Sequence, residues 1–422
     1  MVRLDGWLTG MDLNGCHLLL IEPPCCPGCR PGPASSRVFV TGAAPLQSGP
    51  ASLIGVLGQT AEGHTLTAAR PFGGGIGRRR LLASAPLVCL AAAAPAVEPL
   101  KLLQESVTID VHSHAGRLLS VRTNRTFTPV ADSMRDGGLA VVCLAIVSDA
   151  PTHRLMTDHR IHPFRNPAPG ELYAYSHRAF ARLHALATQQ GMTILTDVAS
   201  LQRARSDQPC VIVAAEGGDF LEGNPERVEE AYGQWQLRHL QLTHYRVNEL
   251  GDIQTEEPVH GGLTDFGAEV IRRCNQLGVI VDVAHGTLSL VRRAAAVTTK
   301  PLVLSHTSLT NRPRPFTRLI TPEHAKLVAG TGGMIGIWPV ASLFPNMAAL
   351  AAGMARMVAE VGVDHVGLGT DSMGLVGPAT FDSYAALPGL AAALLAAGFG
   401  VADVRKLMGG NYARVFAASM DG

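Results

Sequence analysis

Apolar runs rich in β-branched residues recur along the chain from residue 105 onward, separated by segments of mixed polarity. Nearly continuous apolar runs of this kind are typical of parallel strands that are covered on both faces. Eight runs predict strands, at residues 107–112, 139–147, 210–215, 237–243, 278–284, 301–305, 332–338 and 364–370.

Apolar residues at helical spacing lie between several of these runs. The pattern predicts helices at residues 171–190, 264–277 and 322–330, and Thr264 is placed to cap the second of them. Strands that alternate with helices in this way indicate a (β/α)8 TIM-type barrel over residues 98–422. In that fold the chemistry lies at the carboxyl ends of the strands.

Residues 1–72 have a different pattern. Short β-like runs are separated by Gly, Pro and Ser, at residues 17–21, 38–41, 53–57 and 64–68. They predict a small β-rich appendage, an OB-like barrel in form, unless this part is a mis-assigned upstream segment. Its Cys26-Pro-Gly-Cys29 motif is half of a zinc site, a redox pair or a motif without chemistry.

Residues 73–97 resemble an export signal. Arg78, Arg79 and Arg80 precede an apolar, Ala-rich run that ends in Ala94-Pro95-Ala96, and the arginines resemble a twin-arginine motif. We therefore expect a periplasmic or secreted protein, or a cytoplasmic one if this segment is an Ala-rich linker. The run is short and contains prolines, which argues against a stable membrane span.

Composition narrows the classes of partner. The chain has 35 Lys+Arg against 34 Asp+Glu, so its net charge of +1 provides no general attraction for nucleic acid. Aromatic residues make up only 5% of the chain, which also disfavours recognition by base stacking. The hydrophobic fraction of 47% is enough for a large core. We therefore expect a folded protein without a nucleic-acid partner.

Acidic and imidazole side chains recur where the predicted strands end. Residues i and i+2 of a strand face the same way, so His112 and His114 can reach one cation. Imidazole and carboxylate ligands together suit zinc, and a carboxylate can bridge two ions. The full set of candidates is His112, His114, Glu216, His244, His285, His306 and Asp371.

Several longer motifs make the comparison with known families specific. The stretches AAEGGDFLEG, LQLTHYRVNELGD, PLVLSHTSLTNRPRPFTR and VGLGTDSMG resemble the membrane dipeptidase (renal dipeptidase) family of binuclear zinc peptidases, within the amidohydrolase superfamily. The likeness extends over about residues 105–420. It implies two zinc ions per chain, and the ligands that it implies are His112 and His114 for the first ion, His285 and His306 for the second, and Glu216 as the bridge.

The resemblance also assigns residues to substrate and chemistry. Asp371 would lie at the first zinc and accept a proton from the bridging water, and His244 would contact the substrate and stabilise the intermediate. Arg318 would hold the terminal carboxylate of the substrate, although Arg312 and Arg314 in the same segment are alternatives.

One position departs from the family. The first strand of these enzymes usually carries His-x-Asp, whereas this chain has His114 in place of the aspartate, so that its site has one negative charge fewer. Many other binuclear amidohydrolases bridge their metals with a carbamylated lysine. None of the lysines of this chain, Lys101, Lys300, Lys326 and Lys406, ends a predicted strand. A carboxylate bridge is therefore required, and Glu216 is placed for it.

The implied activity is hydrolysis of dipeptides by a metal-bridged hydroxide, with a broad specificity that can include a D-residue at the C-terminal position. The preferred dipeptide and the oligomeric state, with a homodimer as one option, stay open. Another amidohydrolase reaction at the same metals, such as lactone hydrolysis, phosphotriester hydrolysis or deamination, is the main alternative. A binding protein without activity is the second.

Overall fold

The computed structural model describes residues 97–119, 126–310, 312 and 314–421, and the backbone of five strands between residues 2 and 71. The chain divides into two compact units, Met1–Ala92 and Ala93–Gly422. We describe each unit by itself. Cys26, Cys29 and residues 73–96 of the signal-like segment lie outside the described residues.

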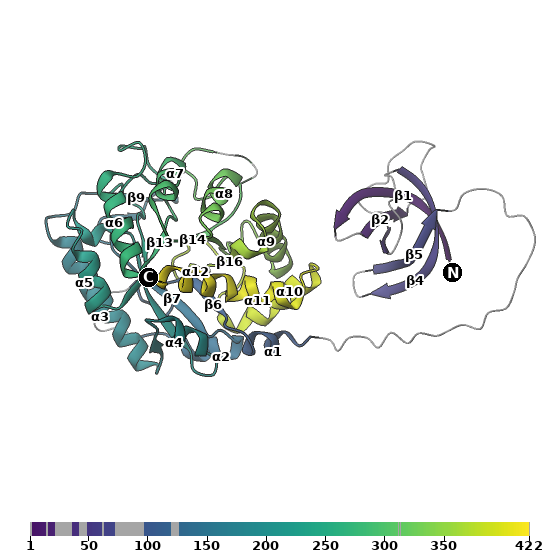
Figure 1. The fold of residues 1–422 in the computed structure, drawn as a ribbon, viewed down its shortest axis with the longest axis horizontal. Helices are drawn as coiled ribbons and strands as arrows, with labels where there is room; N and C mark the ends of the chain where they lie inside the picture. Colours follow the sequence, from purple (N-terminus) through teal and green to yellow (C-terminus); the bar gives the residue numbers. More distant parts are fainter. Residues whose placement is uncertain are drawn as a thin grey trace, which may run out of the picture. The chain divides into compact units, whose positions relative to one another are not determined.

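The first unit consists of antiparallel and parallel strands that close on themselves (Figure 1). Its barrel has the strand order β1-β2-β3-β5-β4. The strands are β1 (Val2–Leu13), β2 (Cys16–Ile21), β3 (Ser36–Thr41), β4 (Gly49–Thr60) and β5 (Gly63–Pro71). The predicted β-rich appendage is confirmed.

The second unit is a nearly closed barrel of eight parallel strands in the order β6-β7-β11-β12-β13-β14-β15-β16. Each strand overlaps one of the eight predicted runs, so the (β/α)8 prediction is confirmed. The bounds are β6 (Ile109–Ser113), β7 (Val141–Val147), β11 (Cys210–Glu216), β12 (Leu237–Gln241), β13 (Ile280–Asp282), β14 (Leu302–Thr307), β15 (Met334–Ile337) and β16 (Val366–Leu368).

The first and last strands of this barrel meet just beyond their carboxyl ends. Ser113 and Ser372 form a parallel bridge. The backbone N–H of Asp371 donates to His112 O and that of His114 donates to Ser372 O, both at 2.9 Å. These bonds bring the segment after β16 beside the histidines of β6, so the closure of the barrel itself positions Asp371.

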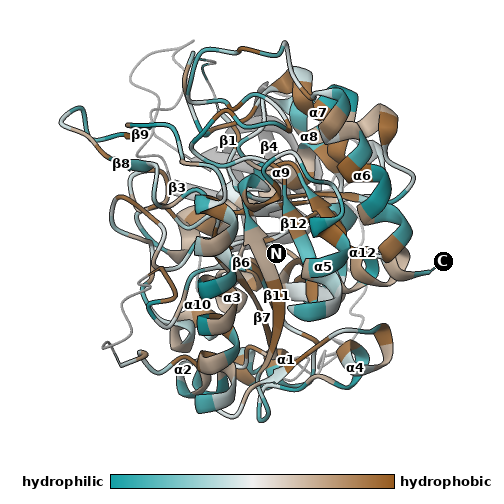
Figure 2. Ribbon diagram, turned by 90° about the vertical axis from the view of Figure 1, so that its left-hand side faces the viewer, coloured by the Kyte–Doolittle hydropathy of each residue, from teal (hydrophilic) through white to brown (hydrophobic). Residues whose placement is uncertain are grey.

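Helices surround the barrel, and in Figure 2 those at its outside, such as α5 and α6, carry apolar and polar sides. The predicted helices are found as α3 (Glu171–Gln189), α6 (Asp265–Leu277) and α8 (Pro322–Gly330). The others are α1 (Pro99–Gln104), α2 (Ala131–Gly137), α4 (Val198–Arg203), α5 (Arg227–Gln234), α7 (Leu288–Val297), α9 (Met347–Val361), α10 (Leu387–Ala396), α11 (Val401–Arg405) and α12 (Asn411–Met420). In the part of the chain that is described, no helix combines the length and the apolar character needed to cross a bilayer.

Three short strands were not predicted. Strand β10 (Thr193–Ile194) adds to β11, and a hairpin of β8 (His153–Leu155) and β9 (Ile161–Pro163) follows β7. The hairpin strands are three residues long and half-buried to exposed, so they have no apolar run that would reveal them. The hairpin carries residues of the pocket described below.

Candidate metal centre

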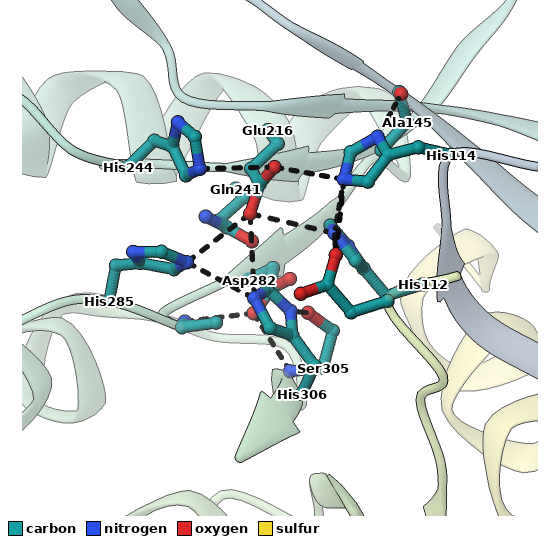
Figure 3. Close-up of polar contacts among 12 residues, drawn as sticks. His112, His114, Ala145, Glu216, Gln241, His244, Asp282, His285, Ser305 and His306 are labelled. Carbon is teal, nitrogen blue, oxygen red and sulfur yellow. Dashed lines mark hydrogen bonds and ion pairs between the residues drawn. The ribbon is translucent and has the colours of Figure 1, made fainter. Parts of the chain in front are cut away.

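The strand ends of the barrel bring all seven candidate residues to one buried cluster (Figure 3). Each histidine and carboxylate in it is no more than 7% exposed. His112 lies on β6 and His114 directly follows it, Glu216 ends β11, and His306 lies on β14. His244, His285 and Asp371 lie shortly after β12, β13 and β16, respectively.

Glu216 is the centre of the cluster. Its Oε1 lies 3.2 Å from His285 Nε2 and 3.4 Å from His306 Nε2. Its Oε2 lies 3.1 Å from His114 Nε2 and 3.3 Å from His244 Nε2. The two oxygens of one carboxylate thus face different histidines, as a ligand that bridges two cations would.

The remaining contacts complete two sets of donors. His112 Nε2 lies 3.2 Å from His114 Nε2 and 3.5 Å from Glu216 Oε1. Asp371 Oδ1 lies 3.4 Å from His114 Nε2 and 4.0 Å from His112 Nε2. His285 Nε2 and His306 Nε2 are 3.1 Å apart, and both face Glu216 Oε1, as His112 Nε2 does.

These spacings fit metal ions. Two ligand atoms that each lie about 2.0–2.1 Å from a tetrahedral zinc ion are roughly 3.3 Å apart. Three groups of side chains each have their ligand atoms within 4.8 Å of one another. These groups are His112–His114–Asp371, His112–Glu216–His306 and Glu216–His244–His285. The donor set is nitrogen and carboxylate oxygen, which suits zinc. His244 is as close to Glu216 as the other histidines are, so the geometry also permits it as a ligand.

The electrostatics of the cluster favour metal binding by most of its donors. Burial acts to raise the pKa of Glu216, but His244, His112 and the other histidines around it hold this pKa well below its usual value. Burial lowers the pKa values of His285 and His306 well below the usual range, so their rings are neutral donors at neutral pH.

His114 behaves differently from these two histidines. Burial acts to lower its pKa, but hydrogen bonds to Asp371 and Glu216 outweigh burial and raise this pKa to about 10. The family's aspartate would not carry such a proton. Binding of a cation by His114 Nε2 would release this proton.

Hydrogen bonds outside the cluster orient its rings. His114 Nδ1 is 2.8 Å from Ala145 O, which requires a hydrogen on Nδ1 and directs Nε2 toward Glu216 and Asp371. His306 Nδ1 is 2.9 Å from Ser305 Oγ. His244 Nδ1 is 2.7 Å from Asp149 Oδ1, so its Nε2 is likewise directed at the cluster.

The backbone at two of these residues is strained. His285 has φ 66° and Asp371 has φ 49°, in the left-handed region that non-glycine residues rarely adopt. Asp371 also needs room, because a Cβ at Gly374 would collide with its Oδ1 and with the His114 ring. The local chain is therefore held in an unfavourable conformation that directs Asp371 toward His114.

A pocket of about 210 Å³ opens beside Asp371, lined also by Tyr245, Arg318 and Trp338. Arg318 is 9% exposed, with Nη1 donating to Gln254 Oε1 (3.0 Å) and Nη2 donating to His306 O (3.2 Å). Arg312 and Arg314 are exposed and do not line this pocket. Of the three arginines that the sequence left open, only Arg318 lines it.

Asp149 is a site residue that was not predicted. It orients His244 and also accepts a hydrogen bond from Tyr245 N (3.0 Å). Burial acts to raise the pKa of Asp149, but the charges of His244 and His153 outweigh it and lower this pKa. Asp149 follows β7 at its carboxyl end, so the rule that found the other residues could have found it. Arg160, which also lines the pocket, lies in the unpredicted hairpin and does not follow a predicted strand, so this rule could not have found it.

The chain is similar in sequence to known dipeptidases. The family model "Membrane dipeptidase (Peptidase family M19)" matches residues 99–421. Dipeptidase aclJ of Aspergillus oryzae is 31% identical over 206 residues, which are 46% of this chain and 48% of the relative. The chain thus spans about half the length of this curated relative.

Solved structures share the fold. A metallopeptidase from Rhodobacter sphaeroides, liganded with a phosphinate mimic of the dipeptide L-Ala-D-Ala, has TM-score 0.62 and 20% identity over 75% of this chain and 100% of its own. The probable dipeptidase PvdM of Pseudomonas aeruginosa has TM-score 0.64 and 17% identity over 76% and 97%. Because the family model spans nearly the whole barrel unit, this chain belongs to the membrane dipeptidase family, peptidase family M19.

Proposed function

We propose that this chain is a dipeptidase that depends on two zinc ions. The observation that carries the proposal is the position of Glu216, whose oxygens lie within 3.5 Å of five histidines at four strand ends, beside a pocket that Asp371 and Arg318 both line. Membership of the M19 family supports the same reaction class.

Each metal would be held by a different part of the cluster. His112, His114 and Asp371 would hold the first ion and His285 and His306 the second, with Glu216 shared between them. A pair of zinc ions supplies a water of low pKa and a Lewis acid for the scissile carbonyl. Burial of these side chains keeps bulk water away from the reacting atoms and strengthens every charge interaction at the site.

Two side chains would act on the substrate during the reaction. Asp371 lines the pocket and its Oδ1 lies near the first set of ligands, so it can accept a proton from the attacking water and deliver it to the leaving amine. His244, held through Nδ1 by Asp149, has its Nε2 3.3 Å from Glu216 Oε2 at the cluster, where it would stabilise the developing oxyanion.

Arg318 would select the substrate by its terminal carboxylate. Its guanidinium is held by neutral acceptors and lies 5.4 Å from the centroid of the Trp338 ring. Its Nε makes no hydrogen bond within the described residues. A planar guanidinium with free donors can bind a carboxylate with two hydrogen bonds, which favours short peptides with a free C-terminus.

The related metallopeptidase from Rhodobacter sphaeroides was liganded with a mimic of a dipeptide that ends in D-alanine. We extend this to the present chain and expect it to accept a D-residue at the C-terminal position. Hydrolysis rates of L-Ala-L-Ala and L-Ala-D-Ala, measured side by side, test this expectation.

A substrate panel tests the reaction class. The zinc-loaded protein is assayed with L-Ala-L-Ala, L-Ala-D-Ala, a simple lactone and a phosphotriester, each with and without a chelator. We expect chelator-sensitive hydrolysis of the dipeptides and little turnover of the other substrates. Faster turnover of the lactone or the phosphotriester would assign the site to another amidohydrolase reaction.

A further inference from the structure

A second arginine lines the same pocket as Arg318. Arg160 lies directly before β9 in the β8–β9 hairpin. Its Nη2 donates to Phe316 O at 2.7 Å and to Thr255 O at 3.4 Å, and its guanidinium carbon lies 5.9 Å from the centroid of the Phe316 ring. Carbonyl oxygens and a ring fix the position of this guanidinium, but they do not neutralise its charge.

Acidic side chains near the hairpin have other partners. His162 contacts Asp158 Oδ2 at 2.8 Å and Glu256 Oε1 at 2.6 Å. Asp158 Oδ1 accepts from the backbone N–H of Arg160 at 3.0 Å, not from its guanidinium. Among the residues that the structure describes, no ion pair joins Arg160 or Arg318 to a carboxylate. Both arginines therefore bring unpaired positive charge to the pocket.

Among the described residues that line this pocket, Asp371 is the one carboxylate, and it faces the candidate metal centre. Asp371 Oδ1 lies 3.4 Å from His114 Nε2, where the proposed function needs it. The pocket thus offers two guanidinium groups to a bound molecule. A dipeptide with a neutral C-terminal residue has one carboxylate and would leave the second guanidinium unpaired. A dipeptide that ends in Asp or Glu has a carboxylate for each.

We infer that the site prefers dipeptides with an acidic residue at the C-terminal position. This inference rests on the proposed function, in which Arg318 holds the terminal α-carboxylate. Because Arg160 lines the same pocket, its partner is the side-chain carboxylate of that same residue. A guanidinium–carboxylate pair with two hydrogen bonds is strong and directional, so the preference falls on the charged side chain over its amide isostere.

The isosteric pairs Ala-Asp and Ala-Asn, and Ala-Glu and Ala-Gln, test the inference on the full-length, zinc-loaded protein. L- and D-forms of the second residue are both assayed. We expect kcat/KM for the better acidic dipeptide to exceed that for its amide by about tenfold to a hundredfold, the scale of a charged hydrogen-bonded pair. If kcat/KM for the acidic dipeptide is about equal to that for its amide in both pairs, the inference is overturned.

Variants assign the preference to Arg160. We expect Arg160→Gln, which keeps a donor for Phe316 O but removes the charge, to lower the acid-to-amide ratio to near one. Arg160→Lys should retain part of it. Arg154→Gln is the matched control, since Arg154 lies in the same hairpin but does not line the pocket, and should keep the full ratio.

These assays distinguish a failure of the proposed dipeptidase activity from a failure of the role of Arg160. If no dipeptide is hydrolysed, the proposed function fails. If dipeptides are hydrolysed and the acid-to-amide ratio is unchanged in Arg160→Gln, only the role of Arg160 fails. A preference for an acidic N-terminal residue, tested with Asp-Ala against Asn-Ala, would also overturn the inference.

Discussion

At the scale of single residues, Glu216 is the side chain on which the metal centre depends. Its two carboxylate oxygens face five histidines, whose ring nitrogens lie 3.1–3.5 Å away. The lysines of the barrel unit cannot replace it, because Lys101 and Lys326 lie in helices α1 and α8, Lys300 precedes β14 and Lys406 follows α11. A neutral side chain at this position would remove the negative charge that, in the proposed function, two cations share.

We therefore expect Glu216→Gln to lose at least one zinc ion per chain and most of the activity. A neutral amide is a poor bridge between two dications. Metal content by mass spectrometry and turnover of a dipeptide are measured on the same sample. Glu226→Gln, at an exposed carboxylate shortly after the same strand, is the control. Normal metal content and turnover in Glu216→Gln would remove Glu216 from the site.

Asp371 allows chemistry to be separated from metal binding. We expect Asp371→Asn to keep much of its zinc and to lower kcat on the order of a hundredfold or more, the usual scale for a general acid–base group. An asparagine can still coordinate weakly but cannot take a proton from water. Zinc content, melting temperature and kcat are compared in one preparation. A lower melting temperature with unchanged kcat would instead make Asp371 a structural residue.

At the scale of elements, the sequence predicts the barrel well because each strand is a nearly continuous apolar run. It predicts the site because strand ends of a parallel barrel meet at one mouth, which places Glu216 and Asp371 together although they are far apart in the chain. The position of a side chain within a loop cannot be predicted in this way. Asp149 follows β7 as the other candidates follow their strands, but its role in orienting His244 is seen only from their contact, and Arg160 is recognised only from the fold of a short polar hairpin.

Helix α6 shows how local chemistry fixes an element. Thr264 Oγ1 accepts the backbone N–H of Gly267 at 2.9 Å, as the sequence predicts, and the helix buries Val270, Ile271 and Cys274. We expect Thr264→Ala to lower the free energy of unfolding by about 1 kcal/mol, the usual value of an N-cap. Denaturant unfolding measures this loss. Thr264→Ser keeps the hydroxyl and should show a much smaller change; equal losses in both variants would contradict the cap.

At the scale of the whole molecule, the described candidate residues all belong to one of the two compact units. The division falls after Ala92, and α1, with Leu102 and Leu103 in the core, belongs to the barrel unit. The barrel has its own core, formed by the strands and the helices around them. This arrangement makes the barrel unit a candidate for independent folding and activity.

We expect residues 98–422 alone to fold and to hydrolyse dipeptides at a rate comparable to that of the full chain. Circular dichroism, gel filtration and the dipeptide assay check this. The full-length protein, purified in parallel, is the reference. A truncated protein that is insoluble or inactive beside an active full chain would show that the first unit is part of the enzyme.

The central claim is that dipeptide hydrolysis depends on two metal ions held around Glu216. The most direct test strips the full-length protein of metal and adds zinc in steps, with bound zinc and hydrolysis of L-Ala-D-Ala measured at each step. We expect no hydrolysis without metal and a rate of dipeptide hydrolysis that rises until two zinc ions are bound per chain. Full turnover without metal, or a protein saturated with zinc that hydrolyses no dipeptide, would contradict it.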